Sequence, residues 1–161
     1  MLKKKATKIE VLFWSIALPG FGQLLNGKLI KSLVFIFLEI LVNVNSSFNL
    51  GILFSFNGEI LKAIEVIDYQ WLMFYPCLYL FAIWDAYRDA AGDELPDYYF
   101  FPFVFGAYFV TVGLIYSKSF KMFGFLFGPI FSPMIFLIFG LLVGFIIRAV
   151  ILTIKKQRQV I

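Results

Sequence analysis

Residues Pro133 to Thr153 read PMIFLIFGLLVGFIIRAVILT and carry one charge, that of Arg148. An α-helix needs roughly 20 mainly apolar residues to cross the hydrocarbon core of a bilayer, and this stretch is long enough. Hydrophobic residues make up 61% of the chain, not counting its 12 glycines, whereas a soluble domain is about 45–50% apolar with glycine included. The sequence therefore predicts an all-α integral membrane bundle, with residues 1–161 in a single domain.

Three further apolar stretches predict the other transmembrane helices. They run from Ser32 to Val44, from Trp71 to Trp84 and from Tyr98 to Tyr116, and each ends in charged or turn residues. With the first stretch they predict about four transmembrane helices, over residues 30–46, 71–88, 98–117 and 133–154. The 22 phenylalanines, 8 tyrosines and 3 tryptophans suit lipid contact and the aromatic belts at the membrane interfaces.

The composition argues against several classes of function. The net charge is +4, but the cations lie at segment ends rather than in a basic patch with exposed aromatics, so nucleic acid binding is not expected. Histidine is absent and Cys77 is the single cysteine, which removes the usual proton shuttle, the common catalytic pairs and an intramolecular disulfide. The sequence contains no P-loop, dinucleotide fingerprint or other catalytic motif. We expect no catalytic residue, no cofactor and no metal site.

The first apolar piece, Val11 to Leu25, is too short to span and is interrupted by one proline and two glycines. We interpret residues 9–27 as a re-entrant hairpin with helices near Glu10–Leu18 and Phe21–Asn26. Irregular backbone at membrane depth is tolerated only against other helices or beside a wet cavity. A cleaved signal peptide is the alternative, but no A-x-A-like cleavage site follows the run, so a retained anchor is favoured. The candidate hairpin residues are Pro19, Gly20, Gly22, Gln23, Asn26 and Gly27.

The placement of lysine and arginine orients the predicted helices. If the hairpin returns to the cytoplasmic side and four helices cross, 11 cations lie on or near that side and three lie outside: Lys62, Lys118 and Lys121. If the first piece crosses instead, the split becomes 7 to 7. Cytoplasmic loops carry an excess of lysine and arginine, so the first arrangement is favoured. We expect a multi-pass protein of the plasma membrane with both termini in the cytoplasm.

Two shorter pieces are predicted at the outer face. Residues 58–69 place Ile60, Leu61, Ile64 and Ile67 at helical spacing, with charged residues opposite. They form either a short amphipathic helix in the interface or a solvated turn of helix between spans. Residues 120–132 are apolar but broken by glycine and proline, so we expect a separate shallow piece before the last span.

Two ionisable residues lie deep in the predicted spans. Glu39 is eight residues past Lys31, hence about 12 Å along its helix, and Arg148 is seven before Lys155, hence about 10 Å. Under the favoured topology their depths are similar, and an unpaired charge in hydrocarbon costs several kcal/mol. We therefore predict a Glu39–Arg148 ion pair. Two alternatives stay open: the pair only locks two helices together, or Arg148 reaches the headgroups.

A charged cluster closes the second predicted span in the segment WDAYRD. Asp85 shares a helix face with Arg88 and with Asp89. The cluster could receive the hairpin, because the helix N-terminus near Gly22 favours a nearby anion. The simpler interpretation is an interfacial helix end whose charges pair with one another. No ligand spacing in the segment specifies a cation site.

A GxxxG pattern, Gly140 to Gly144, lies within the last predicted span, and Gly124 to Gly128 repeats the spacing. Small residues at this spacing permit close helix approach, within the bundle or between two copies. Packing within the chain is the favoured interpretation.

The stretch LPGFGQLLNGK, from Leu18 to Lys28, contains a P-G-x-G-Q-x-x-x-G element followed by an apolar span. It resembles an element of small, mostly uncharacterised bacterial membrane proteins and looks distantly like the paired-helix hairpin of TM2-domain proteins. The segment WDAYR, from Trp84 to Arg88, looks like the second element that such proteins often carry. The chain is similar overall to small membrane proteins of Bacillus-like bacteria, but it departs from TM2 domains in its four spans and lacks their aspartate-containing turn. The resemblance implies an architecture and no reaction.

These observations favour a non-enzymatic scaffold or accessory subunit whose partners are the lipid bilayer and other membrane proteins or a second copy. A transporter, channel or lipid-handling component using Glu39, Asp85 and Arg148 is the alternative. A membrane enzyme ranks third, because the chain lacks a clustered nucleophile, base or metal site. A polar cavity that reaches Glu39 favours transport, and a dry, salt-bridged interior favours a scaffold.

Overall fold

A computed structural model describes residues 6–158, and the lysines at positions 3, 4 and 5 lie outside this range. The described chain is mostly helical, in agreement with the predicted fold class. In chain order the elements are α1 (Lys8–Ala17), α2 (Phe21–Leu25), α3 (Leu29–Ser46), α4 (Phe48–Phe56), α5 (Ile60–Val66), α6 (Tyr69–Leu72), α7 (Tyr75–Ala91), the 3-10 turn η1 (Gly92–Glu94), α8 (Phe101–Ile115), β1 (Lys121–Met122), β2 (Phe125–Leu126) and α9 (Gly128–Arg158).

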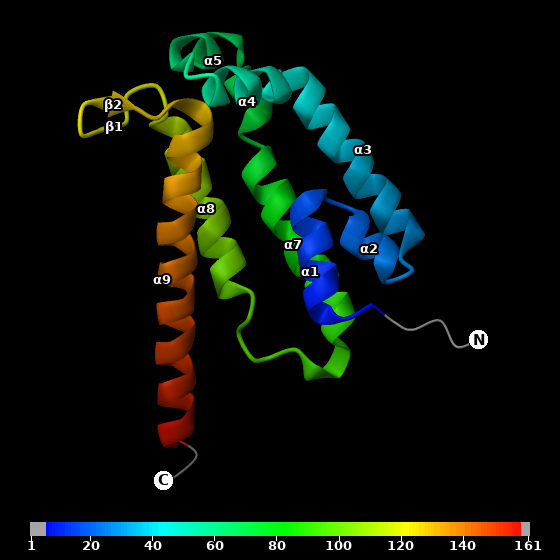
Figure 1. Cartoon of the computed structure of the whole chain (residues 1–161). Helices are drawn as coiled ribbons and strands as arrows, with labels where there is room; N and C mark the ends of the chain where they lie inside the picture. The colour runs from blue at the N-terminus through cyan, green and yellow to red at the C-terminus, as the bar shows by residue number, and fades with distance from the viewer. Residues whose placement is uncertain (1–5, 159–161) are drawn as a thin grey trace.

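The long helices alternate in direction between two ends of the molecule. Figure 1 shows α3 rising to the end where α4 and α5 lie across the bundle, α7 descending, α8 rising and α9 descending. Helix α1 packs against α2 and α7, and α2 packs against α3, so the N-terminal pair fills the space between α3 and α7. The start of α1 and the end of α9 consequently lie toward the same end of the bundle.

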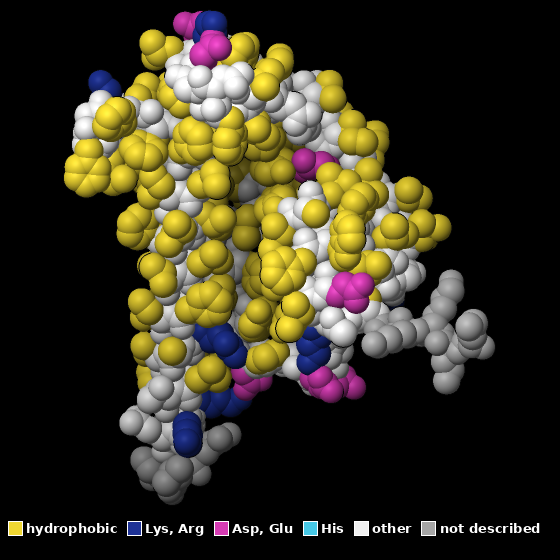
Figure 2. All heavy atoms as spheres, in the orientation of Figure 1, with side chains coloured by type: hydrophobic (Ala, Val, Ile, Leu, Met, Phe, Trp, Pro, Cys, Tyr) yellow, Lys and Arg dark blue, Asp and Glu magenta, His cyan; other side chains and the backbone are white. Residues whose placement is uncertain are grey.

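Among residues 6–158, two helices are long and apolar enough to cross a membrane, α3 with 18 residues and α9 with 31. A third candidate arises if α5 and the helices from Tyr69 to Glu94 count as one span bent by 88°. Helix α8 is apolar but has 15 residues. Hydrophobic side chains cover most of the visible surface between the two ends of the bundle (Figure 2). Charged side chains gather at these two ends. This distribution suits a protein surrounded by acyl chains rather than by water.

Helix α9 begins earlier than the sequence suggested. The separate apolar piece expected at 120–132 is instead a small β-hairpin, in which Lys121 pairs with Leu126, followed directly by α9 from Gly128. Pro133 lies inside this helix. It is the sixth residue of the helix, so the carbonyl of Pro129 loses its helical N–H partner, and the helix nevertheless continues to Arg158. Gly124 has φ +83° in the β-turn and therefore takes no part in helix packing.

The outer segment between α3 and α7 is more structured than expected. Ser47, at φ +55°, turns the chain from α3 into α4, a helix that the sequence analysis missed. The amphipathic helix predicted over 58–69 is shorter, because α5 ends at Val66 and Asp68 caps α6 by accepting from two backbone N–H groups. Of the predicted apolar face, Ile67 is buried at the C-cap of α5, Ile60 and Ile64 are half-buried and Leu61 is exposed. Ala63 is buried as well, so the predicted face lies inward except at Leu61.

Helices α8 and α9 pack closely along their length, and the two glycines of the predicted GxxxG lie at their contact. A Cβ atom on Gly140 would stand 2.5 Å from the carbonyl oxygen of Phe105, and one on Gly144 would stand 2.5 Å from Cα of Pro102. Both distances are shorter than real Cβ atoms make, so glycine permits this approach. The glycines therefore pack helices within one chain, as the sequence analysis favoured.

Candidate functional site

The chain reverses direction between α1 and α2 at the Pro-Gly segment. Pro19 is fully buried, and Gly20 has φ +103°, a backbone conformation that residues with a Cβ atom rarely adopt. A Cβ on Gly20 would also stand 2.7 Å from the carbonyl oxygen of Ser32 on α3. Glycine is therefore required here both for the turn and for the contact with α3.

Helix α2 lies against three helices at once. A Cβ on Gly22 would overlap the hydroxyl of Ser15 on α1 and would stand 2.7 Å from Cβ of Ala86 on α7. The hairpin formed by α1 and α2 is thus packed between α3 and α7 with no room for a side chain at Gly22. Gly27, at φ +72°, completes the turn into α3 and has open space around it.

Two amide side chains of the hairpin bond to α7. The buried Gln23 donates from Nε2 to the carbonyl oxygen of Ala82 at 2.8 Å and to Oδ2 of Asp85 at 3.3 Å. Asn26 donates from Nδ2 to the carbonyl oxygen of Ala86 at 2.8 Å. Asn26 therefore binds the backbone of the WDAYRD segment, whereas Gln23 binds the backbone just before that segment and the side chain of Asp85.

The charged cluster of α7 completes this contact through α3. The Nζ of Lys31 donates to both oxygens of Asp85, at 2.9 and 3.0 Å, and to Oδ2 of Asp89 at 2.8 Å. Arg88 donates to Oδ1 of Asp85 at 2.8 Å. The side chains of Asp85 and Asp89 are 5% and 16% exposed, whereas those of Lys31 and Arg88 are 39% and 41% exposed. The acids are therefore buried beneath cations that reach the surface. We call Gln23, Lys31, Asp85, Arg88 and Asp89 the hairpin-docking cluster.

The predicted Glu39–Arg148 ion pair is wrong. Glu39 is buried and accepts a hydrogen bond at Oε1 from the hydroxyl of Tyr75, at 3.2 Å. Arg148 instead donates from Nε to the carbonyl oxygen of Asp97 at 3.0 Å, and its guanidinium lies 5.4 Å from the ring centre of Tyr99. The reason is the order of the helices: α3 packs on α7, whereas α9 packs on α8. Similar depth did not make the two side chains neighbours.

The loop between α7 and α8 is tied to the end of α9. Lys155 donates from Nζ to Oδ2 of Asp97 at 2.5 Å. This hydrogen bond holds the pKa of the Asp97 carboxyl below its usual range. At the start of the loop, Lys8 of α1 pairs with Glu94 at 2.5 Å. These contacts fasten the loop at its start to α1 and near its middle to α9.

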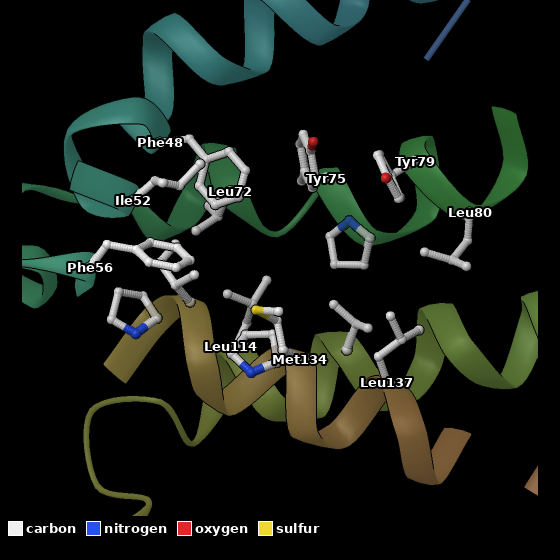
Figure 3. Close-up of a pocket in the computed structure, with 15 residues that line it drawn as sticks. Phe48, Ile52, Phe56, Leu72, Tyr75, Tyr79, Leu80, Leu114, Met134 and Leu137 are labelled. Atoms are coloured by element: carbon white, nitrogen blue, oxygen red, sulfur yellow. The ribbon is translucent and has the colours of Figure 1, made fainter. Parts of the chain in front are cut away.

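An apolar cavity of about 300 Å³ lies between α4, α7, α8 and α9. Figure 3 shows Phe48, Ile52 and Phe56 at one end, and Leu114, Met134 and Leu137 facing Tyr75 and Tyr79 across it. Both tyrosine hydroxyls bond outside the cavity, that of Tyr75 to Glu39 and that of Tyr79 to the carbonyl oxygen of Ile16. The cavity therefore presents carbon surface, and Glu39 does not line it.

The structure thus brings the hairpin residues and the Asp85 cluster together and keeps Glu39 and Arg148 apart. The roles of Lys31, Tyr75 and Asp97 as hydrogen-bond partners were not expected from the sequence. The position of Lys31 in the sequence indicated such a role, because Lys31 comes soon after the hairpin and lies near the start of the helix that follows it. Among the described residues, no group of three or more His, Cys, Asp or Glu side chains could hold a metal ion.

Comparisons with protein-family models, with curated proteins and with solved structures find no match for this chain. Its function is therefore inferred from its own residues and their geometry.

Proposed function

We propose that this chain is a four-span protein of the plasma membrane that acts as a non-enzymatic scaffold or accessory subunit. The spans are α3, α7, α8 and α9, and the hairpin of α1 and α2 enters from the cytoplasmic side and returns to it. Helices α7 and α8 have lengths of about 25 and 22 Å, less than the hydrocarbon thickness of about 30 Å. Aromatic residues flank α8 at both ends, and local bilayer thinning accommodates short spans at modest cost.

The distribution of cations supports this orientation. Lys31, Arg88 and Lys155 stand at the start of α3 and the ends of α7 and α9, which lie toward the end of the bundle with the described chain ends. Lys62, Lys118 and Lys121 belong to α5 and to the segment around β1, at the opposite end. The first end is accordingly the cytoplasmic one, where short loops carry more lysine and arginine. We also propose that the chain is related in architecture to small bacterial membrane proteins that carry a P-G-x-G-Q hairpin.

One observation supports the choice of a scaffold: the charged groups of the hairpin-docking cluster bond to one another. Asp85 accepts from Gln23, Lys31 and Arg88, and the cavity between α4, α7, α8 and α9 offers carbon surface. A substrate path needs polar groups free to exchange partners, whereas a bundle that holds its shape needs them paired. The cluster therefore supports a structural role for these charges.

The test is to delete the gene in the native host and quantify its other membrane proteins. A scaffold or accessory subunit predicts that a specific membrane protein becomes less abundant and cross-links to this chain, and that wild-type protein restores it. The variant Asp85→Asn, in which the hairpin is loosened, should restore it poorly, whereas the exposed-site control Asp93→Asn should restore it fully. Unchanged abundance of every membrane protein would contradict the proposal.

One observation favours the alternative, a transporter or lipid-handling component. The second carboxylate oxygen of Glu39, Oε2, is buried and has no hydrogen-bond partner among the described residues. A carboxyl group in a span that lacks a full set of partners is a candidate for ion or proton binding. Ion or proton flux into liposomes that contain the purified protein, abolished by Glu39→Gln, would replace the scaffold by a transporter.

A further inference from the structure

A second and larger hollow lies on the bundle surface, between α7 and α8. This groove has a volume of about 760 Å³ and is lined by apolar and aromatic side chains, among them Cys77, Trp84, Phe100, Val104 and Tyr108. It shares only Leu80 with the cavity of Figure 3. With the membrane location proposed above, the groove faces the acyl chains of the bilayer and reaches the cytoplasmic interface at Trp84 and Phe100.

The interfacial mouth of the groove carries a cation. Arg88 lies one turn beyond Trp84 on α7, and its guanidinium stands 4.5 Å from the ring centre of Trp84. Two carboxylates face Arg88, Asp85 at 2.8 Å and Asp89 at 4.0 Å, and Lys31 binds the same two acids. The two cations and the two acids cancel in total charge, but the acid side chains are 5% and 16% exposed and the cations about 40%, so the exposed part of the cluster is mainly cationic.

Trp84 adds an unused hydrogen-bond donor at the same place. Its indole Nε1 is buried and has no acceptor within residues 6–158. A buried donor without an acceptor costs free energy. Because the protein covers this N–H, an oxygen from outside the chain can accept from it only after a local side-chain movement that exposes it. The phosphate and ester oxygens of a phospholipid are acceptors found at interfacial depth, where tryptophan N–H groups commonly lie.

We propose that the groove between α7 and α8 holds an acyl chain of an anionic phospholipid of the cytoplasmic leaflet, with the lipid phosphate at Arg88 and the N–H of Trp84. The apolar lining accommodates the chain, and the exposed guanidinium selects the negative headgroup. Basic residues near an anionic membrane surface contribute about 1 kcal/mol each, which corresponds to about a fivefold preference over a zwitterionic lipid. The proposal depends on the membrane location and orientation stated above.

Tryptophan fluorescence in bilayers tests the proposal directly. In the variant W14F/W71F, Trp84 is the single tryptophan, and brominated acyl chains quench it on contact. At equal mole fractions we expect a brominated anionic phospholipid to quench Trp84 more than a brominated zwitterionic one, with about a fivefold difference in apparent affinity. Arg88→Gln should abolish this preference and Arg88→Lys should keep most of it. Lys156→Gln, which removes a cation from the same end of the bundle, should leave the preference unchanged.

A second variant avoids the docking cluster altogether. Ala107 lines the groove on α8, so Ala107→Phe should obstruct it and reduce quenching at Trp84 while Arg88 stays paired. The variant W14F/W84F reports from Trp71, outside the groove, and should show no headgroup preference.

Three results would overturn the proposal. Equal quenching of Trp84 by both lipids would show ordinary contact with the bulk bilayer. Weak quenching by both, together with disulfide-linked dimers through Cys77, would show that a second copy fills the groove. A preference that survives both Arg88→Gln and Ala107→Phe would place the anionic lipid elsewhere. A wrong topology can be distinguished from a wrong lipid site. It changes the side of the membrane from which engineered cysteines are labelled, but it does not change the headgroup preference.

Discussion

Asp85→Asn tests whether the hairpin is held by the docking cluster. The Asp85 side chain is 5% exposed and accepts hydrogen bonds from Lys31 at 2.9 and 3.0 Å, Arg88 at 2.8 Å and Gln23 at 3.3 Å. Asparagine has nearly the same shape but no charge, so both cations lose their main partner while packing is retained. Breaking a fully buried ion pair costs about 3–5 kcal/mol.

The expected loss is smaller than that range. Lys31 and Arg88 are about 40% exposed, and Asp89 remains as a partner, so water and Asp89 recover part of the lost interaction. We therefore expect Asp85→Asn to lower the free energy of unfolding by about 2–3 kcal/mol. Because the hairpin loses its anchor, a cysteine introduced in a Cys77→Ala background at Ser15, which is buried in the intact protein, should also become accessible to a thiol reagent.

Unfolding in detergent micelles, followed by circular dichroism against increasing denaturing detergent, measures the difference. Asp93→Asn is the matched control, because Asp93 is exposed in η1, and it should change stability by less than about 0.5 kcal/mol. A double-mutant cycle with Lys31→Met should return a coupling energy of about 1–2 kcal/mol with Asp85. Equal stability of Asp85→Asn and Asp93→Asn would refute the docking role of the cluster.

Three other predictions follow from the contacts described. Glu39→Leu removes the acceptor of the Tyr75 hydroxyl and should lower the free energy of unfolding by about 1 kcal/mol. Glu39→Gln keeps an acceptor and should lower it by less than half as much. Equal losses of stability in detergent unfolding would contradict the Tyr75 contact. Gly144→Leu places side-chain atoms on the backbone of Pro102 and should lower the free energy of unfolding by about 1–3 kcal/mol. The lipid-facing control Phe145→Leu should leave stability nearly unchanged in the same assay. Two variants of unchanged stability would show that α8 and α9 do not pack here. The lowered pKa of Asp97 means that its bond to Lys155 adds stability above the unfolded-state pKa and loses it as the pH falls through the folded-state pKa. Asp97→Asn should therefore reduce the acid-induced fall in the unfolding midpoint, and an identical pH profile would show that the pair is not formed.

The parts of the fold that depend on local chemistry could be predicted from the sequence. The apolar runs around Phe37 and Leu141 exceed what a soluble helix carries, and they appear as α3 and α9. The Pro19-Gly20 pair marks a reversal because proline ends a helix and glycine accepts positive φ. The two glycines of the last span meet α8 because only glycine allows the backbones so close.

The parts that depend on which helices are neighbours could not be predicted. Helical rise gives the depth of Glu39 and Arg148, but it does not give the position of their helices around the bundle axis, and α7 and α8 separate them. The pairing of Asp85 with Arg88 on its own helix could be predicted, but its second partner, Lys31, could not, because Lys31 lies on a different helix. Helix α4 was missed because the segment after Ser47 is apolar without a clear period, so its start depends on a single residue with positive φ.

The measurement that tests the central claim most directly is the labelling of single cysteines from each side of the membrane. In a Cys77→Ala background, Lys28→Cys reports the end of the hairpin and Lys118→Cys reports the loop after α8. A bundle embedded in the bilayer, with a hairpin that returns to its own side, predicts that an impermeant reagent labels residue 118 in intact cells and residue 28 only after the membrane is opened. Labelling of residue 28 from outside, or recovery of the protein in solution without detergent, would contradict that claim.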